Sequence, residues 1–240
     1  MKKKLLVISD GNGVDNDYKK WPFYLKLLTS KTHTVINRSV VGASNEFIFM
    51  QLSDEINKQD YDCTILQWSL PKRFDVIVND FWLEQARQDP IYHFNIVENN
   101  NQTWWVTSRS ENSHIQEYHN KFVRGWQSLQ RTQCYIMAAA ELLKFKKIDF
   151  VFSLCYDFEF IEPNKQILES YPWVKFKNNK GYSEFRYKSK YASYDKNLGR
   201  PHTLINLDWI NTVLKPSVPF VNYDEQTYLR LEDRLVKQLT

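Results

Sequence analysis

The sequence predicts an α/β fold, a three-layer α/β/α sandwich around a mostly parallel, doubly wound sheet of the flavodoxin-like kind. Short apolar runs alternate along the chain with segments in which apolar residues recur at helical spacing. The first run, KLLVIS at residues 4–9, is apolar throughout, which is typical of a strand covered on both faces. Because 240 residues with 42% hydrophobic content suffice for a full core, we expect a single domain over residues 1–240.

The expected strands are the short segments in which apolar residues run together. They lie at residues 4–9, 33–40, 62–68 and 148–155. A polar loop or a helical segment separates each from the next, so neighbouring strands are expected to run parallel. In such sheets the ligand site lies where the strands end, so the loops that follow them are the segments to search for chemistry.

The expected helices are the segments in which apolar residues recur every three or four positions. They lie at residues 20–30, 42–59, 112–147, the later part of 201–214, and the C-terminal tail. Pro22 suits a first helical turn, and Ser44 is a suitable N-cap. Gly125 allows a bend in the longest helix.

Two stretches lack this regularity. Residues 73–110 form an aromatic-rich elaboration with a hairpin expected around Asn99–Asn101. Its Trp104–Trp105 pair is either an exposed surface for sugar stacking or for a partner, or ordinary structure. Residues 160–200 are rich in Lys, Asn and Tyr and are expected to be mostly loop. In the helices, Trp126 and Trp209 are expected to face the core.

Composition excludes several classes of protein. The net charge of +4 comes from scattered residues, so no nucleic-acid partner is expected. No run approaches the roughly 18 apolar residues of a membrane span, and no signal peptide is evident, which favours a soluble cytoplasmic protein with no membrane partner. The three cysteines are far apart and form no CxxC, so buried free thiols are expected. The histidines at 33, 93, 114 and 119 are expected on the surface or on a helix face.

The loop after the first strand, SDGNGVDND at residues 9–17, has three readings. A phosphate cradle would need GxGxxG or GxxxxGK[ST], and the loop has only Gly-x-Gly followed by acids. A metal loop would use Asp10, Asp15 and Asp17, but their spacing of five then two fits D-x-D-x-D poorly. A Gly/Asn turn with exposed acids is the third reading. We therefore expect no metal and no cofactor.

The order of several short blocks resembles the SGNH (GDSL-type) hydrolase superfamily. The blocks are KWPFYL at residues 20–25, NRSVVGASNEFIFMQL at 37–52 and WSLPKR at 68–73. They are most similar to the branch that is common in phages and marine microbes. The resemblance covers most of the chain and is weakest over 76–110 and 156–194. It implies the α/β sandwich expected above and ester chemistry without a cofactor.

The resemblance assigns roles position by position. The family's nucleophilic serine falls on Gly11, so the site is degenerate, and the preceding family Asp falls on Asp10. Ser9 is a candidate replacement nucleophile, or else a hydroxyl bonded to backbone. The oxyanion donors fall on the backbone of Gly42 and near Ser69.

The last block of the family is Asp-x-x-His. His202 matches the histidine and is the expected general base, but Gly199 stands three residues before it. Asp195 is therefore the nearest upstream acid. Arg73 is a candidate clamp for an anionic substrate, or a plain surface ion pair.

Three functions follow from these matches. The first is an SGNH-like ester hydrolase or acyl transferase that acts on an acylated carbohydrate or other small ester. The second is a catalytically inactive module of the same fold that binds a glycan or forms part of a phage particle, in which case it is virion-associated. The third is another transfer reaction that uses His202 and Asp10 without a serine. The sequence does not fix the oligomeric state.

Overall fold

The structure is a computed structural model of the chain. It describes residues 2–10, 20–40, 42–73, 75–77, 84, 96–99, 102–106, 116–117, 121, 125–174, 181–195 and 203–238.

The centre of the molecule is a sheet of four parallel strands in the order β2-β1-β3-β7. The strands are β1 (Lys3–Ser9), β2 (His33–Asn37), β3 (Cys63–Trp68) and β7 (Asp149–Leu154). All four were expected, and β2 ends three residues earlier than predicted. The chain steps outward from β1 to β2 and then returns across β1 to β3. This reversal makes the gap between the ends of β1 and β3 the topological switch point, where open α/β sheets bind ligands.

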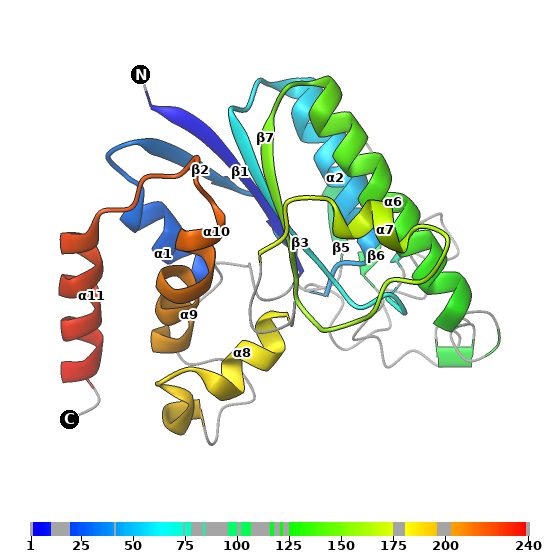
Figure 1. Ribbon diagram of the computed structural model, residues 1–240. Coiled ribbons are helices and arrows are strands. Elements are labelled where there is room, and N and C mark those ends of the chain that lie inside the picture. The colour runs from blue at the N-terminus through cyan, green and yellow to red at the C-terminus, as the bar shows by residue number, and fades with distance from the viewer. Residues whose placement is uncertain are drawn as a thin grey trace.

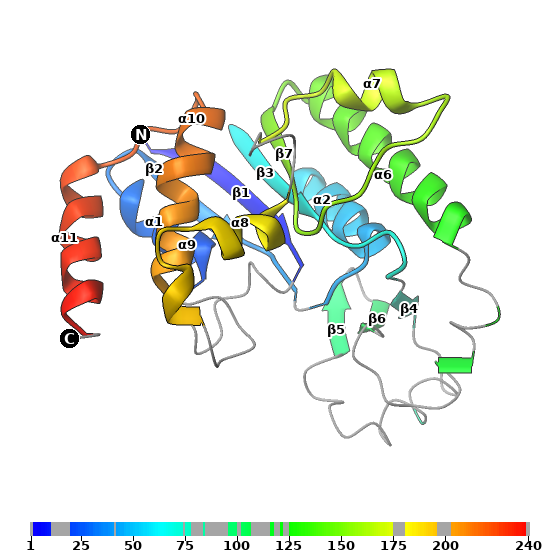
Figure 2. The ribbon, with the colours of Figure 1, turned by 60° about the horizontal axis from the view of Figure 1, so that its bottom comes forward.

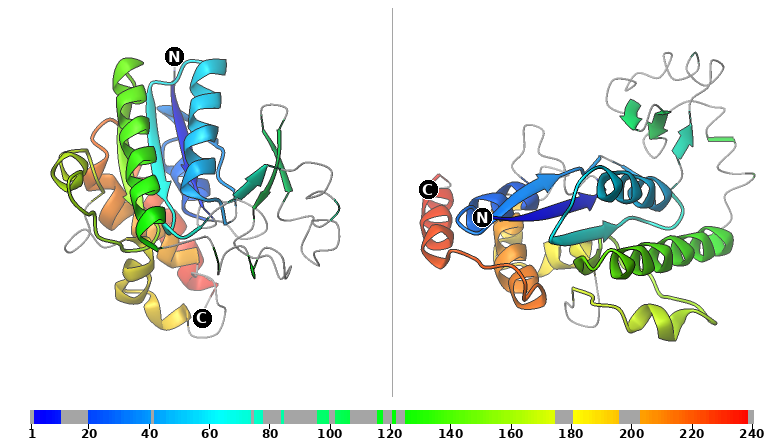
Figure 3. Two further views of the ribbon diagram at one scale, coloured as in Figure 1. Left: turned by 90° about the vertical axis from the view of Figure 1, so that its right-hand side faces the viewer. Right: turned by 90° about the horizontal axis from the view of Figure 1, so that it is seen from above.

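Helices cover both faces of this sheet, which confirms the predicted three-layer α/β/α sandwich (Figures 1 and 3). The helices α2 (Asn45–Lys58) and α6 (Gly125–Phe145) pack on one face. The helices α1 (Trp21–Leu28) and α9 (Thr203–Trp209) pack on the other, and α11 (Glu225–Lys237) lies against them. A π-helical segment (Ile210–Leu214) and α10 (Lys215–Ser217) continue α9.

The alternation of side chains along β1 divides the core into two apolar clusters. Leu5 and Val7 belong to the cluster under α1 and α9, whereas Leu6 and Ile8 belong to the cluster under α2 and α6. All four are at most 1% exposed. A strand buried on both faces has to be apolar at every position, which is why KLLVIS shows no alternation.

The ends of the first two helices follow the signals in the sequence. Pro22 stands in the first turn of α1, where its missing N–H removes no helical hydrogen bond. Ser44 caps α2, and its side chain accepts a hydrogen bond from the backbone N–H of Phe47 at 3.2 Å.

Three expectations about helices need correction. The stretch 160–200 contains α7 (Lys165–Glu169), α8 (Tyr182–Lys188) and a 3₁₀ turn (Ala192–Asp195) in its described part, so it is less irregular than expected. Of the predicted helix 112–147, α6 accounts for Gly125–Phe145, and residues 116–117 and 121 are also helical. Trp126 was expected in the core and is 63% exposed, because α6 begins beyond the edge of the sheet (Figure 2).

Two further expectations about burial were wrong. His33 is buried because it begins β2 beside β1, not at the surface as predicted. Cys134 is exposed on α6, whereas Cys63 and Cys155 are buried as expected, and all three are free thiols. A helical cysteine in a partly apolar pattern cannot be assigned to the buried or the exposed face from spacing alone.

A second, three-stranded sheet lies within the 73–110 elaboration. It consists of β4 (Asp75–Ile77), β5 (Ile96–Asn99) and β6 (Gln102–Val106), in the order β4-β6-β5. The antiparallel pair β5–β6 closes with Asn99 opposite Gln102, which confirms the predicted hairpin. The side chains of Trp104 and Trp105 lie outside the described part. Among the described residues, no helix is long and apolar enough to cross a membrane.

Candidate functional site at the carboxyl edge of the sheet

The strands deliver a set of polar residues to one edge of the sheet, here called the carboxyl edge. Ser9 ends β1 and Asp10 follows it, while Ser69 follows β3. Arg73 comes four residues later in the chain, and Tyr156 lies beyond the end of β7. The structure brings these segments together at the β1/β3 switch point.

Asp10 joins the segments that follow β1 and β3. Its carboxylate oxygen Oδ2 accepts a hydrogen bond from Ser69 Oγ at 2.8 Å and one from Arg73 Nη1 at 2.6 Å. Asp10 is 1% exposed, so its charge is removed from water and balanced by the guanidinium. The ion pair of Arg73 is therefore internal and not on the surface, and the role of Arg73 as a clamp for an anionic substrate stays a prediction.

Tyr156 holds the other side of the Arg73 guanidinium. The guanidinium carbon lies 5.4 Å from the centre of the Tyr156 ring, in a cation–π arrangement. Burial raises the pKa of Tyr156, and the charge of Asp10 adds to this effect. The phenol therefore stays neutral at physiological pH, and its hydroxyl oxygen accepts a long hydrogen bond from Arg73 Nη2 at 3.4 Å.

Asn45 fixes the backbone of Ser69. Its Oδ1 accepts from the Ser69 N–H at 2.7 Å, and its Nδ2 donates to the Ser69 carbonyl at 3.1 Å and to Thr132 Oγ1 at 3.0 Å. Both donors of Ser69, the N–H and the O–H, are thus engaged within the protein. Sequence reasoning missed Asn45. It is an amide at the first position of a helix, and such a residue is read as part of the N-terminal turn.

Ser9 is fully buried at the end of β1. Its hydroxyl donates to the Asp10 carbonyl at 2.9 Å and lies 3.0 Å from Ser39 Oγ, which in turn donates to Asn37 Oδ1 at 2.7 Å. This is the backbone-bonded arrangement that the sequence left open as an alternative. The role of Ser9 as a nucleophile stays a prediction.

Gly42 shapes the loop that follows β2. Its φ of 79° lies in the left-handed region, where a side chain would be strained, so glycine is required at this turn. The loop is tied to the small sheet by Asp75, whose Oδ2 accepts from the Ser44 N–H at 2.8 Å. The role of the Gly42 backbone as an oxyanion donor also stays a prediction.

Three expected site residues are not placed. Gly11 and His202 lie outside the described residues, and only the backbone of Asp195 is described, at the end of a 3₁₀ turn. The structure therefore unites Asp10, Ser69 and Arg73, and it leaves the base and the nucleophile position as predictions.

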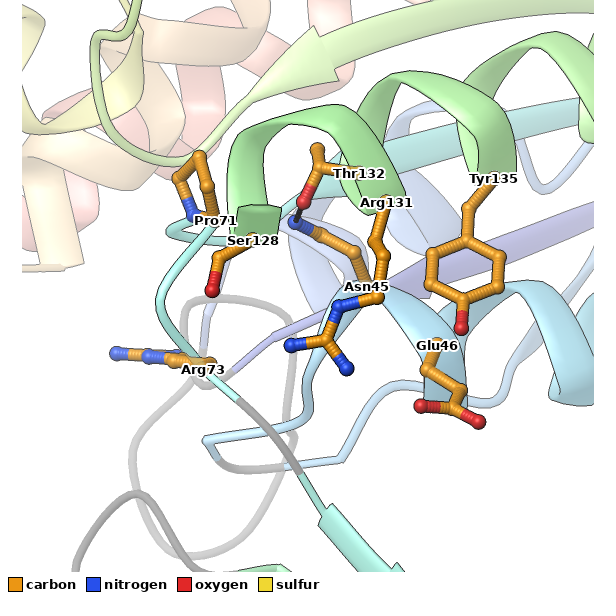
Figure 4. Close-up of a pocket in the computed structure, with 8 residues that line it drawn as sticks. All are labelled: Asn45, Glu46, Pro71, Arg73, Ser128, Arg131, Thr132 and Tyr135. Carbon is orange, nitrogen blue, oxygen red and sulfur yellow. Dashed lines mark hydrogen bonds between the residues drawn. The ribbon is translucent and has the colours of Figure 1, made fainter. Parts of the chain in front are cut away.

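A small cavity adjoins this network between α2 and α6 (Figure 4). It has a volume of about 10 Å³, which is room for about one water molecule. Arg73, Arg131 and Ser128 line it, and the buried Ser128 hydroxyl has no hydrogen-bond partner within the described residues. Burial raises the pKa of the neighbouring Tyr135 to about 12, and Glu46 adds to the rise. The cavity is too small to hold an ester substrate.

Gln67 is a second buried polar group at this edge for which the described part of the chain supplies no partner. It lies in β3 between Ser9 of β1 and Ser153 of β7 in register. Its side chain is fully buried, and neither its amide nitrogen nor its amide oxygen has a hydrogen-bond partner among the described residues. Among the residues described, no group of three or more His, Cys, Asp or Glu could hold a metal ion.

Comparisons with known proteins add the following. No protein-family model and no curated protein sequence matches the chain. Among solved structures, a GDSL-like lipase from Bacteroides thetaiotaomicron is similar, with a TM-score of 0.46, 11% identity, and coverage of 90% of this chain and 88% of that one. A putative acylhydrolase from Bacteroides fragilis is similar with a TM-score of 0.45, 10% identity, and coverage of 90% and 86%.

Proposed function

We propose that the chain is an ester hydrolase or acyl transferase of the SGNH kind, acting on an acylated carbohydrate or another small ester. One observation carries the proposal. The loop after β3, which holds the WSLPKR block that resembles that superfamily, joins the segment after β1 through Asp10, Ser69 and Arg73 at the switch point of the sheet. Open α/β sheets bind their ligands at this crevice.

The chemistry requires a nucleophile, a base and donors to the developing oxyanion. His202, which directly precedes α9, is the proposed base, and the Gly42 backbone is a proposed oxyanion donor. Gly11 carries no hydroxyl, and the hydroxyls of Ser9 and Ser69 are buried and hydrogen-bonded. The proposed nucleophile is therefore a water, or an acceptor hydroxyl in the transfer reaction. It attacks the ester carbonyl as its proton passes to His202, and the alcohol then leaves with that proton.

The same burial favours a second candidate function. A site in which the hydroxyls of Ser9 and Ser69 are hydrogen-bonded and the buried Asp10 carboxylate is paired with arginine suits a binding module without acyl chemistry. Such a module would hold a glycan or serve as a component of a phage particle.

Hydrolysis of p-nitrophenyl acetate separates the two candidates. We expect wild type to cleave it and His202→Ala to lose about 100-fold or more in rate, as loss of a general base does. His119→Ala is the matched control and should keep the wild-type rate. Ser9→Ala should also remain active, and a fluorophosphonate probe should label no serine.

Two results would change the assignment. If Ser9→Ala abolishes cleavage and the probe labels wild type, Ser9 is the nucleophile and the water mechanism is wrong. If wild type is inert on acetyl esters and on acetylated sugars, the hydrolase proposal fails and the binding module stands.

A further inference from the structure

A second pocket lies at the opposite edge of the sheet, where β1 and β2 begin. Its volume is about 470 Å³, and residues 2–3, 31–33, 220 and 222 line it. In Figure 1 the N-terminus, β2 and α10 lie on this side of the molecule. Lys3 and His33 are partners in the β1–β2 register, so the sheet itself fixes this part of the pocket. The volume lies within the range of about 300–1,000 Å³ that small-molecule sites occupy.

The charge of this pocket is one-sided. Lys2, Lys3 and Lys31 line it, and no residue that lines it is acidic. Asp224 pairs with Lys31 at 2.6 Å, and this contact holds the pKa of Asp224 down at about 2. Two lysines, Lys2 and Lys3, form no ion pair within the described part of the chain.

His33 contributes a buried polar atom to the same pocket. The ring is 3% exposed, and its Nδ1 lies 2.8 Å from Thr32 Oγ1. Among the described residues its Nε2 has no hydrogen bond of ordinary geometry, although the Phe220 carbonyl is close enough to raise the pKa of the ring. Burial and the charge of Lys3 outweigh that carbonyl and the charge of Asp62, and they lower the pKa of His33. The ring is therefore neutral at physiological pH in the free protein.

We propose that this pocket binds a small molecule that carries a phosphate-type dianion, at a site distinct from the carboxyl edge. Lysine ammonium groups act as point charges that suit a multiply charged anion, whereas planar recognition of a carboxylate favours arginine, and no arginine lines the pocket. The partly buried Phe220 supplies an apolar wall for the body of the ligand. A bound dianion would offset the charge of Lys3 at His33, so binding is accompanied by proton uptake.

Titration calorimetry with inorganic phosphate and with glycerol phosphate tests the proposal at constant ionic strength. We expect both anions to bind wild type and Lys2→Gln/Lys3→Gln to weaken binding about tenfold, the equivalent of about 1.4 kcal/mol. The matched control is Lys165→Gln/Lys188→Gln, which removes the same charge from exposed positions on α7 and α8 and should bind like wild type. Repeating the titration in buffers of different ionisation enthalpy measures proton uptake, which should fall in His33→Gln.

The outcomes are distinct. Binding that both double variants weaken equally would show general charge attraction and overturn the proposal, as would the absence of binding to wild type. Binding to vesicles that contain phosphatidic acid, without binding to glycerol phosphate, would replace a small-molecule ligand with a membrane surface. Thermal unfolding of each variant checks that it is folded. None of these results depends on esterase activity, so the proposal stands or fails apart from the function at the carboxyl edge.

Discussion

At the scale of single residues, Asp10 decides the geometry of the carboxyl edge. It is the residue directly after β1, and it holds Ser69 by a hydrogen bond and Arg73 by an ion pair. A buried carboxylate needs such partners because removing its charge from water costs several kcal/mol. The sequence pointed to all three residues separately: Asp10 at the Asp position of the resembling family, Ser69 as an oxyanion donor and Arg73 as a substrate clamp. Their contacts with one another are a result of the fold.

Removal of Arg73 should therefore destabilise the protein. We expect Arg73→Ala to lower the free energy of unfolding by about 2–4 kcal/mol, since it leaves Asp10 buried without its cation. The Arg73 side chain is 19% exposed, which keeps the expected loss toward the lower end. Urea denaturation measures the change. Arg131→Ala is the control, because Arg131 lies on the exposed side of the adjacent cavity, and it should change stability by less than about 0.5 kcal/mol. A loss for Arg73→Ala no larger than for this control would contradict the role of the pair.

Replacing Gln67 by an apolar residue, in contrast to removing Arg73, should not destabilise the protein. A buried amide without hydrogen bonds costs about 1–3 kcal/mol, so replacing it by methionine, of similar length, should leave stability unchanged or raise it by about 1 kcal/mol. Asn45→Leu is the contrasting variant, because the Asn45 amide makes three hydrogen bonds, and it should lose about 2–3 kcal/mol. Thermal and urea unfolding of the two variants give the comparison. A clear loss of stability in Gln67→Met would mean that the amide has partners after all.

At the scale of elements, α2 illustrates a helix whose limits can be read from the sequence. Ser44 supplies the cap, Ile48 and Leu52 face the core, and the helix ends at Lys58 as its apolar stripe ends. Local hydrogen bonding and apolar periodicity both depend on residues that are close in sequence, so the limits of α2 can be predicted without knowing how the rest of the chain folds.

Loss of the cap of α2 should be measurable. We expect Ser44→Ala to lower the free energy of unfolding by about 1 kcal/mol, because the N–H of Phe47 loses its partner. Ser30→Ala, at an exposed position after α1, should have an effect smaller than about 0.5 kcal/mol. Chemical denaturation of both variants tests this. Equal effects would show that the cap does not stabilise α2.

The α6 helix shows where element-level reading fails. Trp126 continues the apolar spacing of the helix, yet it is 63% exposed, whereas Ile136 and Ala140 on the same helix are buried. Periodicity identifies a face of a helix but not how far along the helix that face meets a partner. The length of the sheet beneath α6 sets that limit, and it depends on strands that are distant in sequence.

At the scale of the whole molecule, burial sorts the three cysteines. Burial raises the pKa of the Cys63 thiol to about 12, and Cys155 is also buried, so neither presents a thiolate to solvent near neutral pH. We expect Ellman's reagent to modify Cys134 rapidly in the native protein, and all three thiols after denaturation. Cys134→Ser should abolish the rapid phase. Rapid reaction of a second thiol in the native protein would contradict the packing described for β3 or β7.

The two edges of the sheet also belong to this scale. Residues at the ends of β1 and β3 meet at the switch point, and residues at the starts of β1 and β2 meet in the basic pocket. The sequence identified the loops that follow the strands as candidate sites because ligands of open parallel sheets generally bind at the carboxyl ends of the strands. It gave no reason to join Lys2 and Lys3 with Lys31 and His33, since the two pairs are about thirty positions apart and His33 was expected on the surface or on a helix face.

By itself the sequence determined the α/β class, the four parallel strands, the first turn of α1, the cap of α2 and the hairpin at Asn99–Asn101, because each depends on local spacing or on turn chemistry. Only the tertiary structure decided that Asp10 pairs with Arg73, that Asn45 holds Ser69, and that His33 is buried while Trp126 is exposed. Those facts depend on strand order and on where distant segments pack. Contacts between residues far apart in the chain leave no mark in local patterns.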